Sequence, residues 1–237
     1  MSFGGAFAGR WVGGMANKPA PLPPFWDPHS EGLPVVAAYR AIGADSLEAS
    51  KVNLANPGTY DLTAPVGFTS PLWSKERGWY RAAGTDLWEI GVLAHSSWSF
   101  VLRVHNSPTG LYQFACGTDK TTNTSDAMAV IPNYVPGSYG TAFFNTKRAI
   151  TVPEGTASGT VGIANQRCYR NGLHVATIEV NFTPTNYTRP FFLFSVNRGA
   201  VSQVNSYWGD ILAFSLYSGT LDDTQMLAVS TAMAALK

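Results

Sequence analysis

The sequence has little cysteine, little charge and no long apolar run. Its two cysteines, Cys116 and Cys168, are too few for a disulfide framework. We expect buried free thiols, with a disulfide as the alternative if their strands are neighbours. Charged residues form 13% of the chain and the formal net charge is +1. A nucleic-acid-binding domain usually carries a basic stripe, so no nucleic-acid partner is expected.

Targeting segments are also missing. The first residues, Met1–Gly5, lack a basic start followed by an apolar stretch, so no secretory signal is expected. No apolar stretch approaches the roughly 20 residues that a membrane-spanning helix needs. The sequence therefore predicts a protein made in the cytoplasm, without a membrane span.

The chain is rich in apolar residues and in turn formers. Of its 237 residues, 45% are hydrophobic and 13% are aromatic, and it contains 23 glycines and 15 prolines. This length and composition favour one large β domain with many turns over two small domains.

Residues 1–32 differ from the rest and are predicted to form an extended arm. Glycines cluster first and prolines follow, a pattern that disfavours both helix and central strand. The arm nevertheless carries large aromatic side chains, which a solvated linker rarely does. Two interpretations stay open: the arm folds back over its own domain, or it docks on another protein. The candidate docking residues are Phe3, Phe7, Trp11, Phe25 and Trp26.

From residue 33 onward the pattern is one of strands and turns. Residues 98–105 alternate in polarity, which predicts a half-buried strand. The turn at 106–110 predicts a hairpin to a strand over 111–116. Asn171-Gly172 between two strand-like runs predicts a tight type I′ hairpin. Further strands are expected at 33–40, 87–93, 127–131, 141–145, 149–152, 160–164, 191–196 and 211–217.

The C-terminus is predicted to form one amphipathic helix. Asp222 and Gln225 have the spacing of a capping box. Met226, Val229 and Met233 then recur at helical spacing, with Lys237 near the negative end of the helix dipole. A single helix after many short strands indicates a β-sandwich.

Four segments in order resemble the laminin G-like domains of the concanavalin A-like lectin/glucanase superfamily, in the form found in bacteriophage structural proteins. They are residues 44–63, 98–103, 169–172 and 209–217, the last followed by the helix. The resemblance implies an all-β, two-sheet antiparallel jelly-roll sandwich over residues 33–237. It also implies a curved face at which related lectins hold sugars.

No catalytic set is expected. Glucanases that share this fold carry a Glu-x-Asp-x-x-Glu strand, whose carboxylates act as acid and nucleophile. The nearest segment here is 88–94, where Gly91 and Ala94 stand at the Asp and last Glu positions. Asp86 and Glu89 are three residues apart, so a strand directs them to opposite faces. The sequence therefore predicts a protein that is not an enzyme.

No cofactor is expected either. The four histidines, His29, His95, His105 and His174, have no metal-ligand spacing. A calcium site from Asp119, Asn123 and Asp126 in a polar loop stays open but lacks EF-hand spacing.

Aromatic side chains are candidates for sugar contact, although most of them are expected in the core. Tyr134 and Tyr139 lie in the Pro/Gly-rich segment 132–140, which predicts a surface loop, and they are the preferred candidates. The remaining ones are Trp73, Trp79, Tyr80, Trp88 and Trp208.

These observations give three hypotheses. The first is a non-enzymatic, capsid-decorating bacteriophage virion protein, which is held to capsid or tail proteins by its arm and forms homo-oligomers. The alternative is a carbohydrate-binding adhesion module on the phage tail or surface that contacts host glycans. The third is a divergent glycosidase, which needs two convergent carboxylates.

Overall fold

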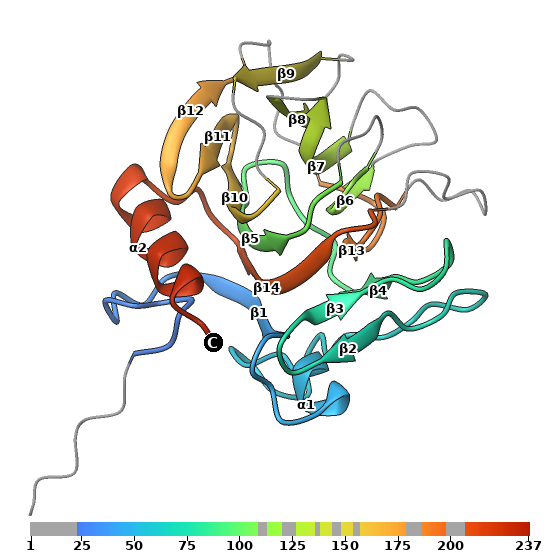
Figure 1. Ribbon diagram of the computed structural model, residues 1–237. Coiled ribbons are helices and arrows are strands. Elements are labelled where there is room, and N and C mark those ends of the chain that lie inside the picture. The colour runs from blue at the N-terminus through green and yellow to red at the C-terminus, as the bar shows by residue number, and fades with distance from the viewer. Residues whose placement is uncertain are drawn as a thin grey trace, which may run out of the picture.

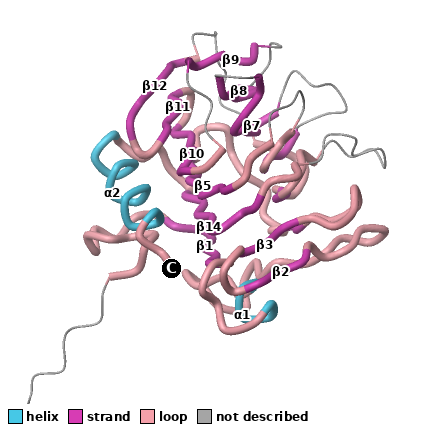
Figure 2. The backbone as a smooth tube through the Cα atoms, viewed as in Figure 1, coloured by secondary structure: helices cyan, strands magenta, loops and turns pink. Residues whose placement is uncertain are grey.

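The computed structural model describes residues 23–108, 113–119, 127–135, 138–143, 148–153, 157–178, 186–197 and 207–237. Within these residues the strands pair antiparallel in two sheets, and helix is confined to two short segments at the periphery (Figures 1 and 2). The predicted all-β two-sheet sandwich with a C-terminal helix is confirmed. No helix in the described ranges is both long and apolar enough to cross a bilayer.

The larger sheet has the strand order β12-β11-β10-β5-β14-β3-β2, and β1 also pairs with β14. Its strands are β1 (Val35–Arg40), β2 (Leu72–Ser74), β3 (Gly78–Tyr80), β5 (Ser99–His105), β10 (Gly159–Ala164), β11 (Arg167–Arg170), β12 (Leu173–Thr177) and β14 (Asp210–Tyr217).

The smaller sheet has the order β4-β13-β6-β7-β8-β9. Its strands are β4 (Trp88–Glu89), β6 (Cys116–Asp119), β7 (Ala127–Val135), β8 (Ser138–Phe143), β9 (Arg148–Pro153) and β13 (Phe192–Leu193).

The core between the sheets is built around packed aromatic rings. Phe214 of β14 lies at its centre, with ring centroids 6.4 Å from Tyr39, 6.1 Å from Phe100 and 5.6 Å from Phe191. All four side chains are fully buried. Cys116 and Cys168 are buried in the same core, and the structure confirms them as free thiols.

Helix α2 (Asp223–Ala234) covers the outer face of the larger sheet. Its N-terminus has the predicted capping box, because Asp222 accepts the Gln225 N–H and the Gln225 side chain accepts the Asp222 N–H. A cation that the sequence did not indicate lies at its C-terminal end. The guanidinium of Arg103, rather than Lys237, donates to the last carbonyls, because Arg103 projects from β5 directly beneath this end.

The helix also explains why β5 is not half-buried as predicted. Phe100 and Leu102 face the inter-sheet core, whereas Val101 packs with Met226 in a second core under α2. Both faces of the strand are therefore covered, although its sequence alternates.

One predicted hairpin is confirmed and one is wrong. Asn171 and Gly172 turn between β11 and β12 with φ of 48° and 77°, as a type I′ turn requires. The expected hairpin after β5 does not form, since β5 pairs with β10 and β14 while β6 belongs to the other sheet. After β5, the Ser107 N–H donates to the Ala157 carbonyl, so the chain stays beside the segment that leads into β10.

Two other predicted boundaries need correction. The strand expected over 87–93 is limited to β4, because Gly91 takes a φ of 73° and interrupts the extended run. The loop expected over 132–140 is largely strand, since β7 reaches Val135 and β8 starts at Ser138.

The segment 44–63 forms an unpredicted short helix and a polar anchor. Ser46 caps α1 (Leu47–Lys51). The buried side chain of Asn53 accepts the Ala38 N–H at 2.9 Å and donates to the Thr59 carbonyl at 2.8 Å. This side chain fixes the segment against β1.

Candidate functional site

Trp208 presents an exposed indole where the chain enters β14. Its side chain is 47% exposed, and the guanidinium of Arg81 lies 5.3 Å from the ring centroid. The backbone N–H of Trp208 donates to the side-chain oxygen of Gln113 at 3.2 Å. One contact to the ring and one to the backbone therefore hold an aromatic surface that remains open to solvent.

Arg81 is a buried cation that supports this indole. Its Nε donates to the Ala83 carbonyl at 2.9 Å, and its Nη1 donates to the Phe194 carbonyl at 3.2 Å. Burial lowers the pKa of Arg81 to about 10, and the nearby charge of Asp86 opposes this shift. The guanidinium stays charged at neutral pH, and its position is fixed by the backbone of two separate segments.

Phe194 links the two sides of this arrangement. It is one of the non-glycine residues with positive φ, at 69°, and its N–H donates to the Ala115 carbonyl at 2.7 Å. Its carbonyl accepts both the Tyr207 N–H at 3.0 Å and Arg81 Nη1. This strained backbone position thus sets the chain just before Trp208 relative to Arg81.

Tyr207 anchors the same segment from within. Its ring is fully buried and its hydroxyl hydrogen-bonds with the Ser107 hydroxyl. Burial raises the pKa of Tyr207, so the phenol stays neutral. Because Tyr207 points inward, the next side chain along this extended segment, Trp208, points outward.

A cluster of polar side chains surrounds Asp210 on the outer face of the larger sheet. The carboxylate of Asp210 is buried, and its Oδ1 accepts Arg77 Nε at 2.8 Å. Its Oδ2 accepts Asn106 Nδ2 at 2.9 Å and lies 3.7 Å from His105 Nδ1. The Arg77 guanidinium lies 3.9 Å from the centroid of the Tyr80 ring.

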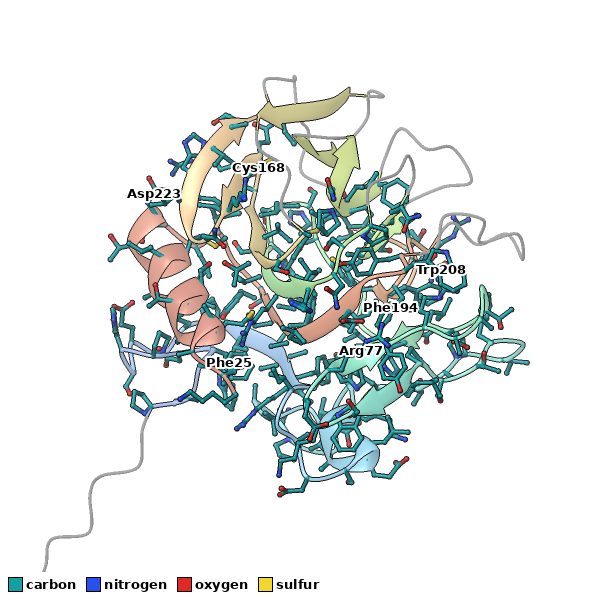
Figure 3. The ribbon with its side chains drawn as sticks, in the orientation of Figure 1. Phe25, Arg77, Cys168, Phe194, Trp208 and Asp223 are labelled. Atoms are coloured by element: carbon teal, nitrogen blue, oxygen red, sulfur yellow. The ribbon has the colours of Figure 1, made fainter. Side chains whose placement is uncertain are left out.

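Strand pairing places the residues of the Asp210 cluster. Asp210 pairs with His105 across β14 and β5, and Ile211 pairs with Trp79 across β14 and β3. Tyr80, whose ring lies under Arg77, and Arg81, which lies over the Trp208 ring, are consecutive residues at the end of β3, so the Arg77 and Trp208 groups are linked through this strand. In Figure 3, Arg77 and Trp208 both lie to the right of Phe25.

The predicted contact residues Tyr134 and Tyr139 lie in β7 and β8 rather than in a loop. Their role in sugar contact stays a prediction. Among the other aromatics, Trp79 and Trp88 are core residues, whereas Trp73 is partly buried with its indole N–H bound to the Ala41 carbonyl.

The predicted docking residues fall in two groups. Phe25 is 6% exposed and belongs to the core under α2, and Trp26 packs edge-on against it with ring centroids 5.0 Å apart. These two rings contact the chain's own domain. Phe3, Phe7 and Trp11 lie outside the described residues, so docking by them stays a prediction.

The carboxylates considered for catalysis have different surroundings. Asp86 is buried and accepts the N–H groups of Ala82 and Ala83 and the Thr69 hydroxyl, which makes it a structural anchor. Glu89 is partly buried in β4, and burial raises its pKa.

Metal ligands are not assembled in the described ranges, where no three His, Cys, Asp or Glu side chains gather. Of the predicted calcium ligands, Asp119 ends β6, while Asn123 and Asp126 lie outside the described residues. The calcium site thus stays a prediction.

Sequence reasoning identified Trp208 only as one of several aromatic candidates and missed the residues around it. Arg77 and Arg81 flank β3, whereas Asp210 starts β14, and no spacing in the sequence relates Asp210 to the two arginines. The one local signal is the alternation of a buried Tyr207 and an exposed Trp208 before a β-strand.

Comparisons with known proteins support the fold but identify no family. No family model matches the sequence, and no curated protein matches it. A mutant Trypanosoma rangeli sialidase displaying trans-sialidase activity superposes with a TM-score of 0.55 at 10% identity, over 86% of this chain and 34% of its own. This likeness shows the sandwich fold alone, and the chain spans about a third of that protein.

Two shorter carbohydrate-related structures are also similar. The CBM40 of Ruminococcus gnavus IT-sialidase, bound to α2,3-sialyllactose, has a TM-score of 0.45 and 19% identity over 59% of this chain and 83% of its own. Domain 4 of the arabinanase AbnA from Geobacillus stearothermophilus, in complex with arabinotriose, has a TM-score of 0.47 and 15% identity, over 84% of this chain and 98% of its own.

Proposed function

We propose that this protein is a non-catalytic carbohydrate-binding domain that stacks a sugar ring on Trp208. The observation that carries the proposal is an indole that is 47% exposed, lies against the Arg81 guanidinium, and belongs to a residue whose backbone N–H is held by Gln113. An exposed aromatic ring with a fixed orientation offers apolar contact without the entropy cost of ordering it on binding.

The chemistry of the surface suits a sugar. A pyranose has an apolar C–H face, which contacts an indole, and hydroxyl groups around its edge, which need hydrogen-bond partners. Gln113 supplies an amide group beside Trp208, and Arg81 supplies a guanidinium against the ring. One aromatic ring with a few polar groups at its edge is a typical arrangement for small-molecule recognition.

The carboxylates near this surface support binding rather than hydrolysis. Glycoside hydrolysis commonly requires two carboxyl groups that face the scissile bond. Asp210 is buried and both of its oxygens contact cationic or amide groups, so it is engaged in holding Arg77. Asp86 is likewise occupied by backbone N–H groups.

A glycan array followed by calorimetry tests the proposal. The wild-type protein should bind a subset of glycans, and Trp208→Ala should weaken that binding by about tenfold or more, the equivalent of about 1.4 kcal/mol. Leu93→Ala is the matched control, because Leu93 is a comparably exposed apolar side chain at 55%. An array on which no glycan binds above background, or equal binding by Trp208→Ala and Leu93→Ala, would contradict the proposal.

A second candidate role is attachment of this domain to a larger assembly, such as a bacteriophage virion. The supporting observation is that Phe25 and Trp26 fix the start of the described chain under α2, on the side away from Trp208 (Figure 3). Residues 1–22 would then fasten the domain while Trp208 stays accessible. Deletion of residues 1–22 should leave glycan binding intact and abolish incorporation into particles; normal incorporation would reject this role.

A further inference from the structure

We propose that Arg77 binds an acidic substituent of the glycan, a carboxylate or a sulfate. The inference deepens the proposed function and rests on it for the rest of the ligand. Its own basis is the geometry of one guanidinium, and the anion-binding step is tested separately below.

Two contacts fix the plane and the direction of this guanidinium. Nε donates to the buried Oδ1 of Asp210 at 2.8 Å, and the guanidinium carbon lies 3.9 Å from the centroid of the Tyr80 ring. An arginine that is stacked and anchored through Nε loses little further freedom when its terminal nitrogens bind a ligand.

The two terminal nitrogens of Arg77 have no hydrogen-bond partner in the described part of the chain. The side chain is 46% exposed, and Nη1 and Nη2 make no hydrogen bond to any part of the chain that the structure describes. These two nitrogens form a planar fork that matches two oxygens of a carboxylate or a sulfate. A neutral sugar hydroxyl offers one oxygen and so accepts from only one of the two nitrogens.

The residues near Arg77 give no net positive charge, so the site selects by directed hydrogen bonds. Lys75 and Glu76 precede Arg77 in the same turn, and Asp210 lies behind it. The charge of Lys75 is in turn paired with Asp45. Because Asp210 is fully buried and its oxygens are engaged, an incoming anion meets the guanidinium rather than a bare carboxylate.

His105 and Asn106 complete the edge of this site. His105 is 52% exposed and lies 3.7 Å from the same carboxylate that holds Arg77. Asn106 has a φ of 51° and donates to that carboxylate at 2.9 Å. His105 thus provides a ring whose NMR signals report on binding at Arg77.

The anion site and the indole platform are connected through consecutive residues. Tyr80 supports Arg77, and the next residue, Arg81, supports Trp208. An acidic oligosaccharide long enough to reach both would place a ring on Trp208 and its charged group on Arg77. The ligand class that fits both features is an acidic glycan.

The test is an NMR titration of the full chain at constant pH and ionic strength. The probes are D-glucuronate, D-glucose 6-sulfate and D-glucose, which differ at carbon 6. We expect saturable shifts of the His105 ring signals with one or both acidic probes and little change with glucose. His174 is the internal reference, because it is exposed on the distant strand β12.

Two substitutions distinguish binding by the planar guanidinium from a general effect of positive charge. Arg77→Lys keeps the positive charge. It should weaken binding of the acidic probes by about tenfold, since an ammonium lacks the planar fork. Lys75→Met removes a charge from the same turn and should change the binding less than about twofold at physiological ionic strength. Thermal denaturation confirms that both variants are folded.

The outcomes distinguish this inference from the proposed function. Absence of a His105 response to both acids, unchanged binding by Arg77→Lys, or equal losses in both variants would overturn the anion site. If glycans bind through Trp208 with no preference for acidic probes, only the anion site fails. If acidic probes bind at Arg77 while no glycan depends on Trp208, the proposed function fails instead.

Discussion

Arg167 holds Asp223 with both terminal nitrogens, through Nη1–Oδ1 and Nη2–Oδ2 contacts of 2.8 Å each. The Tyr169 hydroxyl donates to the same carboxylate at 2.6 Å. Asp223 is the first residue of α2, and Arg167 is the first residue of β11. One carboxylate thereby ties the start of the helix to the larger sheet.

This contact predicts a pH-dependent contribution to stability. The Tyr169 hydrogen bond, followed by that of Arg167, lowers the pKa of Asp223 below its ordinary value of 3.8. The ionised carboxylate is thus favoured in the folded state, so its contribution is present above that ordinary value and is lost as the pH falls through the lower folded value. Asp223→Asn should lower the melting temperature slightly at neutral pH and have no effect in strong acid.

Melting temperatures measured across the acid range check this expectation. Asp45→Asn is the control, because Asp45 is 94% exposed and lies 3.7 Å from its partner Lys75. A difference between Asp223→Asn and wild type that stays constant down to strong acid would show that ionisation of Asp223 is irrelevant.

Arg103 predicts a larger effect at the other end of the same helix. Its Nη1 donates to the Leu236 carbonyl at 2.7 Å and to the Met233 carbonyl at 3.1 Å. Arg103→Met keeps an apolar side chain of similar length and should lower the free energy of unfolding by about 1–2 kcal/mol, since two helix-end carbonyls lose a cationic donor. Urea denaturation measures this loss, and an unchanged midpoint would refute the capping role.

Local signals in the sequence predicted the features whose contacts are local. The Asn171-Gly172 turn and the Asp222/Gln225 capping box each depend on residues within a few positions of one another. Propensity and spacing therefore identified both. The period of two in β5 likewise identified a strand but not the cover on its second face, since α2 follows more than a hundred residues later.

The candidate site is the opposite case. Arg77 and Asp210 are 133 residues apart, and they meet because β3 and β14 are neighbours in the sheet. Trp208 and Arg81 come together through the backbone of Phe194, whose positive φ has no sequence signal. Strand order decides these contacts, and single-sequence patterns do not determine strand order.

Phe214 predicts how strongly the sandwich depends on its aromatic core. The ring is fully buried and lies 5.6 Å from Phe191 and 6.1 Å from Phe100. Phe214→Ala should lower the free energy of unfolding by about 3–5 kcal/mol, because a cavity replaces the ring. Phe214→Leu retains most of the volume and should cost less, whereas Leu227→Ala, at a side chain 42% exposed, should cost little. Equal losses for the buried and exposed positions would contradict this account of the core.

Phe25 predicts where the stable domain begins. The sequence placed the boundary after residue 32, yet Phe25 packs in the core under α2, and the Tyr217 hydroxyl donates to the Trp26 carbonyl at 3.0 Å. Phe25→Ala should therefore lower the free energy of unfolding by about 3 kcal/mol. Deletion of residues 1–22 should leave it unchanged, and deletion of residues 1–32 should lower it at least as much as Phe25→Ala. Denaturation of the three variants checks the boundary: if loss of residues 1–32 costs nothing, the packing of Phe25 does not stabilise the domain and the boundary at residue 33 holds.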